Sequence, residues 1–173
     1  MTLSVGFPPI VGDDARVLIL GTLPGVASLA RGQYYGHPAN AFWWIMGELF
    51  GAEPALPYPE RCERLRAGGI ALWDVCAAAR RAGSLDSAIE PATIAANDIA
   101  GLLGQHPGIG LIAFNGGPAA RLFRRHVLPG LPPATAALPR VVLPSTSPAY
   151  AAMPRAEKLA RWRAALGAFA DRG

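Results

Sequence analysis

The chain has 173 residues, of which 51% are hydrophobic and only 16% are charged, a composition that excludes a disordered protein. A chain of this length can bury a sizeable core, and we expect residues 1–173 to form a single domain. The net charge of +4 comes almost entirely from arginine, because Lys158 is the only lysine, and this permits a nucleic-acid partner.

Short apolar runs alternate with helical patterns along the chain. Strands are predicted over residues 16–20, 70–75, 110–114 and 140–143. Helices are predicted from 41 to about 50, over 60–66, around Ile94, Ile99, Leu102 and Leu103, from 118 to about 127, and from Pro154 onward. The alternation predicts a three-layer α/β/α fold, with helices on both faces of a mostly parallel four-stranded sheet.

The densest group of polar and aromatic residues lies in residues 33–46, just before a predicted helix. Pro38 disfavours a helical backbone at His37, and Asn40 is a favoured N-cap type, so the helix is predicted to begin at Ala41. From spacing alone, Asn40 as a helix cap and the aromatic residues as core account for this segment. A ligand site is the alternative.

The ends of the predicted strands favour that alternative. Each strand is followed by glycine or polar residues, which are found at 21–25, at Asp74, at 115–117 and at 145–150. In open parallel sheets, ligands bind outside the carboxyl ends of the strands. We therefore expect the four clusters to meet at one edge of the sheet and to form a binding site.

Two segments resemble the motif regions of the uracil-DNA glycosylase superfamily. The first comprises Gly-Thr-Leu-Pro-Gly at 21–25 with Gly-His-Pro-Ala-Asn-Ala-Phe-Trp at 36–43, which is similar to the mismatch-specific uracil/thymine branch. The second is Leu-Pro-Ser-Thr-Ser-Pro-Ala-Tyr at 143–150. The runs at 32–35, 72–75, 83–86 and 114–116 most resemble the hypoxanthine-DNA glycosylases. The likeness extends in order from Val17 to Trp162.

One position departs from the mismatch-specific branch. Leu23 stands where that branch has its catalytic asparagine, and a leucine side chain cannot position water. In the hypoxanthine branch the catalytic asparagine lies in the His-Pro-x-Asn run, which corresponds to Asn40. The resemblance therefore implies that Asn40 orients water or stabilises the transition state without forming a covalent bond.

The resemblance also implies a base pocket. Tyr35 matches the aromatic residue that stacks on the flipped base, and Asp74 aligns with a base-reading residue. We hypothesise that ionised Asp74 accepts the N1–H of hypoxanthine, which adenine lacks. A core tyrosine and a capping or arginine-paired aspartate are the structural alternatives. Further candidate base-binding residues are Gly21, Thr22, His37 and Asn115.

The second motif implies contacts with the DNA backbone. Ser145 and Ser147 are expected to hold the phosphates beside the flipped nucleotide, and residues 148–150 to form the wedge. The residues assigned to backbone or wedge contacts are Pro24, Ser145, Thr146, Ser147, Pro148 and Tyr150. Candidate basic faces are supplied by Arg121, Arg124, Arg125 and His126, and by Arg155, Lys158 and Arg161, although charged helix faces are usually only solvated.

These observations predict a monofunctional DNA glycosylase that acts on a deaminated base, chiefly hypoxanthine. A uracil or mixed deaminated-base glycosylase and an inactive lesion-binding module are the alternatives. The matched motifs contain no lysine, which argues against Schiff-base chemistry.

The expected partner is double- or single-stranded DNA containing a deaminated base, bound by a monomer. Cys62 and Cys76 are too few for a disulfide framework or a Cys-rich metal site, and we expect neither a metal nor a cofactor. The sequence shows no secretion signal and no apolar run of membrane-spanning length. We therefore expect no membrane association and a cytoplasmic, nucleoid-associated location.

Overall fold

The fold is built around β2 (Val17–Gly21), a strand whose five residues are all buried in the computed structural model, which describes residues 2–170. It pairs with β3 (Ile70–Asp74) on one side and with β6 (Leu111–Asn115) on the other, and β6 pairs with β7 (Arg140–Leu143). All three pairings are parallel, in the order β3-β2-β6-β7. The four predicted strands are therefore confirmed, and their register places Gly21 directly beside Asp74.

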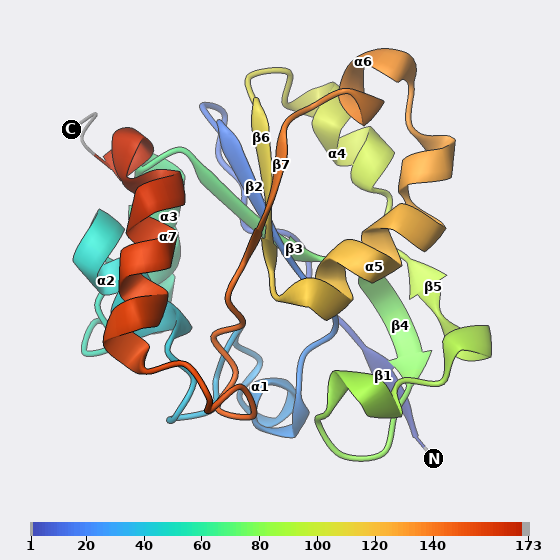
Figure 1. Ribbon diagram of the computed structural model, residues 1–173, viewed down its shortest axis with the longest axis horizontal. Helices are drawn as coiled ribbons and strands as arrows, with labels where there is room; N and C mark the ends of the chain where they lie inside the picture. The colour runs from blue at the N-terminus through green and yellow to red at the C-terminus, as the bar shows by residue number, and fades with distance from the viewer. Residues whose placement is uncertain (1, 171–173) are drawn as a thin grey trace.

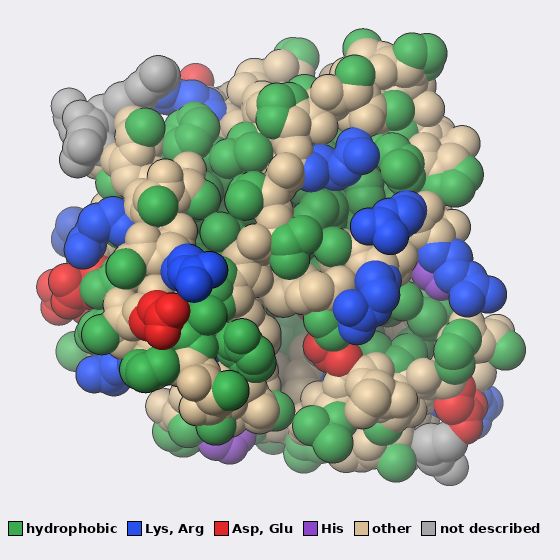
Figure 2. Space-filling view, in the orientation of Figure 1, with side chains coloured by type: hydrophobic (Ala, Val, Ile, Leu, Met, Phe, Trp, Pro, Cys, Tyr) green, Lys and Arg blue, Asp and Glu red, His purple; other side chains and the backbone are tan. Residues whose placement is uncertain are grey.

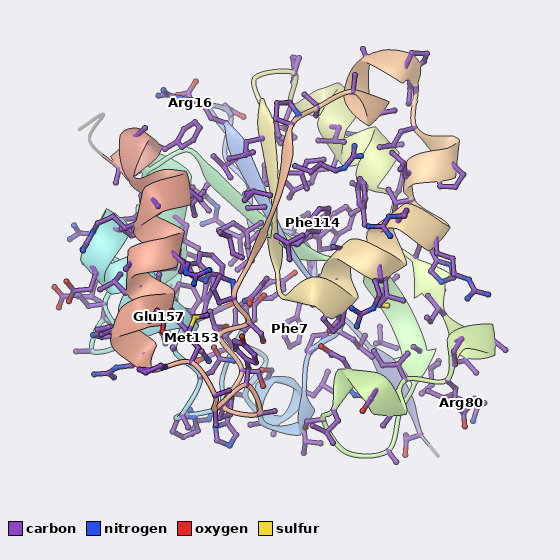
Figure 3. All side chains as sticks on the ribbon, viewed as in Figure 1. Phe7, Arg16, Arg80, Phe114, Met153 and Glu157 are labelled. Carbon is purple, nitrogen blue, oxygen red and sulfur yellow. The ribbon has the colours of Figure 1, made fainter. Side chains whose placement is uncertain are left out.

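Helices cover both faces of this sheet, as predicted (Figure 1). On one face lie α2 (Phe42–Phe50), α3 (Tyr58–Ala67) and α7 (Arg155–Ala170), and on the other lie α4 (Ile99–Gln105) and α5 (Gly117–His126). Alternate residues of β2 enter the two cores, because side chains along a strand point to opposite faces. On the α5 side, the ring of Phe114, which is labelled in Figure 3, has its centre 5.1 Å from that of Phe123.

A second, smaller sheet was not predicted. It is antiparallel and consists of β1 (Leu3–Val5), β4 (Cys76–Arg80) and β5 (Ala95–Ala96). Its strands are short or rich in alanine, which is not a strand-favouring residue, and so their sequences lack a strand pattern. Helix α1 (Val26–Arg31) was also missed, since its six residues are too few to show a helical period. The shorter helices are η1 (Asp86–Ala88), η2 (Pro91–Thr93), η3 (Leu128–Gly130) and α6 (Pro133–Ala136).

Two predicted helix starts need correction. Ile94 lies outside α4, which begins at Ile99 after Asp98, whose Oδ1 accepts a hydrogen bond from the Gly101 N–H at 2.9 Å. The start of α4 is therefore determined by a side-chain cap and not by the first apolar residue of the helical pattern. Helix α2 begins at Phe42 rather than at residue 41.

No helix within residues 2–170 is long and apolar enough to cross a membrane. In the same part of the chain, no three His, Cys, Asp or Glu side chains gather closely enough to hold a metal ion. The expectation that the protein uses no metal or cofactor stays a prediction.

Candidate active site

A cavity of about 370 Å³ opens at the carboxyl ends of the parallel strands. Residues from all four strand-end clusters line it, as the topology predicts. Figure 2 shows a hollow below the centre of this face. Every residue predicted to contact the base or the DNA backbone, or to act in catalysis, lines this one cavity.

Gly21 allows two functional side chains to meet on the wall of the cavity. A Cβ atom at this position would lie 2.5 Å from Asp74 Oδ1 and 2.7 Å from the hydroxyl oxygen of Tyr35. Real Cβ atoms do not approach other atoms so closely, so any larger residue would push these groups apart. The residue type at position 21 therefore determines how closely the side chains of Asp74 and Tyr35 can approach each other.

Asp74 carries a buried carboxyl group, and the residue is only 4% exposed. No hydrogen bond to its carboxylate is formed within residues 2–170; the Asn97 side chain bonds its backbone carbonyl instead, at 2.8 Å. Burial raises the pKa of this carboxyl from 3.8 to about 7, the negative charge of Asp86 adds to the rise, and Arg81 opposes it. Asp74 is neither the helix cap nor the directly hydrogen-bonded ion pair that were its structural alternatives.

Tyr35 has φ of +53°, the only positive value at a non-glycine residue in the described chain. Its ring packs on the buried Phe42 ring, with centres 4.2 Å apart and planes inclined by 30°. Phe42 does not line the cavity, so it supports Tyr35 from behind. The preceding residue is fixed, because the hydroxyl of Tyr34 donates to the Pro8 carbonyl at 2.7 Å and its own carbonyl accepts from Trp43 Nε1. This scaffold holds Tyr35 in its strained backbone conformation.

The hydroxyl group of Tyr35 is buried and has no hydrogen-bond partner within residues 2–170. Burial and then the nearby Asp74 raise the pKa of this hydroxyl. The Asn115 amide lies close enough to oppose the rise, but its two polar atoms are already bonded to Thr146. An unpaired hydroxyl and an unpaired carboxylate therefore lie on the same wall.

Asn40 lies at the start of α2, where its Oδ1 accepts a hydrogen bond from the Phe42 N–H at 2.9 Å. The capping role considered from the sequence is thus real, although the bond is to the first residue of the helix. Its Nδ2 forms no hydrogen bond within residues 2–170 and can donate into the cavity, which Asn40 also lines. Nearby, Nδ1 of the exposed His37 accepts from the Ala39 N–H at 3.0 Å, which leaves Nε2 as the outward nitrogen.

Asn115 and Thr146 join the two motif regions. The Asn115 amide donates to Thr146 Oγ1 and accepts from the Thr146 N–H, both at 2.9 Å. The Thr146 carbonyl then accepts from the Ala41 N–H at 3.0 Å, beside Asn40. Thr146 is only 1% exposed, so these bonds give it and Asn115 a positioning role.

Helix α7 holds the rest of the second motif. Trp162 Nε1 donates to the Pro144 carbonyl at 2.9 Å, and Lys158 Nζ donates to the Ser147 carbonyl at 3.3 Å. Lys158 is buried, with its ammonium 5.2 Å from the centre of the Tyr150 ring, and burial lowers its pKa. The expectation that Lys158 contributes to a basic face is wrong, because the packing of α7 against this loop covers it.

No role was predicted for Arg81 and Asp86, which support the part of the cavity wall formed by residues 22–24. Buried Arg81 donates to the carbonyls of Leu23, Pro24 and Gly83, and its guanidinium lies 3.9 Å from Asp86 Oδ1. Asp86 Oδ1 also accepts from the hydroxyl of Thr22 at 2.6 Å. Arg81 follows another arginine, a pattern typical of a solvated charge, and the resemblance of the run at 83–86 assigned no role to Asp86.

Comparison with known proteins agrees with this geometry. The family model of the uracil DNA glycosylase superfamily matches residues 8–169. The chain belongs to the uracil DNA glycosylase superfamily. Within it, the chain is 40% identical over 112 residues to proteins named hypoxanthine DNA glycosylase from Methanosarcina barkeri and Methanosarcina acetivorans. Each alignment covers 64% of this chain and 70% of the relative.

The superfamily fold is also found in a solved structure. The solution NMR structure of a proposed uracil DNA glycosylase from Methanosarcina acetivorans matches this chain with a TM-score of 0.79 and 32% identity. The match covers 97% of this chain and 99% of the other. Leu23, the departure from the mismatch-specific branch of the superfamily, is buried and packs with Cys76, Ala79 and Ile89. Its side chain is therefore part of a small core.

Proposed function

We propose that the protein is a monofunctional DNA glycosylase that removes a flipped deaminated base, chiefly hypoxanthine, in base excision repair. The observation that carries the proposal is the buried Asp74 carboxylate, which lines the cavity without a hydrogen-bond partner within residues 2–170. The names of the relatives from Methanosarcina support hypoxanthine as the principal base.

A buried carboxylate is costly unless something donates a hydrogen bond to it. The N1–H of hypoxanthine is such a donor. N1 of adenine is an acceptor, so its lone pair would face the lone pairs of the carboxylate oxygen. Asp74 therefore selects hypoxanthine over adenine when it is ionised. Tyr35 offers its ring, supported by Phe42, as a stacking surface for the base.

Catalysis requires water or charge to be positioned beside C1′ of the extruded nucleotide. The Asn40 oxygen is held by the Phe42 N–H, which fixes the amide plane and leaves the NH₂ group to orient a water molecule. As the C1′–N9 bond breaks, its electron pair passes to the base. The water supplies a hydroxyl group to C1′, and the proton it loses is balanced by the one gained by the released base.

The second motif positions the DNA in this proposal. Ser145 and Ser147 line the cavity and bind the phosphates beside the flipped nucleotide, while exposed Pro148 and Tyr150 form the wedge. The exposed arginines of α5 supply general attraction to the backbone. We further propose that the chain acts as one domain and as a monomer, in association with the nucleoid in the cytoplasm.

The test is release of free base from matched oligonucleotides that carry hypoxanthine, uracil, xanthine or no lesion. We expect preferential release of hypoxanthine, and a loss of at least about a hundredfold in Asn40→Ala. Asp98→Ala is the matched control, because it removes a side-chain cap from α4, outside the cavity. Both variants should lose about 1 kcal/mol of stability through the lost cap, but Asp98→Ala should keep its activity.

Each outcome of this assay discriminates between the functions considered. Faster release of uracil would overturn the Asp74 recognition scheme while leaving glycosylase activity in place. Lesion binding without release of any base would identify a binding module. Equal loss of activity in Asn40→Ala and Asp98→Ala would assign Asn40 to folding alone.

A further inference from the structure

Exposed apolar side chains gather around the mouth of the cavity. Six large hydrophobic residues are exposed within residues 2–170, and three of them, Val26, Leu85 and Tyr150, line this cavity. Tyr150 belongs to the second motif, but Leu85 lies in a different loop and has no role in the proposed function so far. Its side chain is accessible, with the residue 57% exposed.

The loop that carries Leu85 is anchored on both sides of it. The preceding residue, Ser84, accepts a hydrogen bond from the Val26 N–H through its Oγ at 2.9 Å. The following residue, Asp86, accepts from the Thr22 hydroxyl at 2.6 Å and lies near the buried Arg81 guanidinium. These bonds fix the backbone, so Leu85 cannot fold back into the core without breaking them.

Leu85 and the second motif lie at separate places on the same mouth. No hydrogen bond or ring contact joins residues 83–87 to residues 145–150 within the described chain, although both segments line the cavity. In the view of Figure 1, the green η1 turn that follows Leu85 lies to the right of α1, and the orange-red segment 145–150 lies toward its left. A duplex that delivers a base into the cavity therefore meets an apolar side chain from each segment.

We propose that Leu85 is a second wedge, which inserts into the base stack beside the flipped nucleotide, opposite the 148–150 segment. The inference rests on the proposed glycosylase function. Apolar side chains inserted between bases offset the unstacking that extrusion requires, and they act best when their own backbone is already rigid. A protein partner would cover the mouth and exclude the substrate, so the occupant that fits this position is the DNA itself.

The test compares duplex with single-stranded DNA, because only the duplex must be unstacked. Leu85→Ala should lower kcat/KM for a deoxyinosine duplex by about tenfold and change it less than about twofold for the single strand. Leu3→Ala is the matched control: Leu3 is 49% exposed and does not line the cavity, so both values should stay unchanged. Leu85→Met, which keeps an apolar side chain, should restore the duplex activity.

A second measurement separates this inference from the proposed function. Fluorescence of 2-aminopurine placed beside the lesion reports unstacking on binding and requires no catalysis. The wild type and Leu3→Ala should increase the fluorescence several-fold, and Leu85→Ala should not. Equal loss of activity on duplex and single strand, or the same several-fold fluorescence increase in Leu85→Ala as in the wild type, would overturn the wedge. Failure of the wild type to release any base would overturn the proposed function. The fluorescence measurement would still test the wedge, because it requires no catalysis.

Discussion

Replacing Asp74 by asparagine should stabilise the protein at neutral and alkaline pH. The pKa of this carboxyl is raised from 3.8 to about 7 in the folded protein by burial and by Asp86. Below pH 3.8 both folded and unfolded chains are protonated, and the group has no effect. Between pH 3.8 and 7 the unfolded chain loses the proton while the folded chain keeps it, so stability falls as the pH rises.

The size of this effect follows from the pKa change. One pKa unit corresponds to about 1.4 kcal/mol, so the carboxyl lowers the free energy of unfolding by about 4 kcal/mol at pH 8. Asparagine has nearly the same shape and cannot ionise. The advantage of Asp74→Asn over the wild type should therefore grow by about 4 kcal/mol between pH 4 and pH 8.

Urea unfolding of both proteins at several pH values measures this difference directly. Asp13→Asn, the same chemical change at an exposed aspartate, is the matched control. A constant difference between Asp74→Asn and the wild type from pH 4 to pH 8 would refute the raised pKa. In the excision assay, the wild type should gain activity on hypoxanthine as Asp74 ionises near pH 7, and Asp74→Asn should lose that rise.

Substitutions at two other residues test the wall of the cavity. Gly21→Ala places a methyl group 2.5 Å from Asp74 Oδ1, so excision should fall by about tenfold or more. Base release measures the fall, and circular dichroism shows that the variant still folds. Unchanged activity would mean that the close approach of Asp74 and Tyr35 has no function. Tyr35→Phe removes a buried unpaired hydroxyl and should raise the free energy of unfolding by about 1 kcal/mol. Tyr35→Ala should weaken binding to lesion DNA more than binding to undamaged DNA, as measured by titration. Equal weakening on both DNAs would exclude the stacking role.

The strained conformation of Tyr35 belongs with these observations. Within residues 2–170, a positive φ, a buried hydroxyl without a hydrogen-bond partner and a carboxylate without one occur together on one wall of one cavity. Each of them costs stability, and such costs are concentrated at sites where structure serves binding or catalysis. The stabilisation expected for Asp74→Asn and that expected for Tyr35→Phe therefore both measure how much stability the protein loses at this site.

The sequence by itself determined the sheet and the place of the site. Apolar runs and helical periods are local patterns, and parallel strands must bring their carboxyl ends to one edge, so residues as distant as Gly21 and Tyr150 were correctly expected to meet. Strands β4 and β5 of the second sheet escaped prediction because alanine-rich segments form strands only where a neighbouring strand pairs with them.

The tertiary structure decided the electrostatics and the exposure of individual side chains. The raised pKa of Asp74 depends on its depth and on Asp86, and the contact of Arg81 with the carbonyls of Leu23 and Pro24 joins residues 58 and 57 positions apart. Burial turned Lys158 from an expected surface charge into a support for the second motif. Such properties arise from the whole arrangement of neighbours in space, which no local pattern of residues contains.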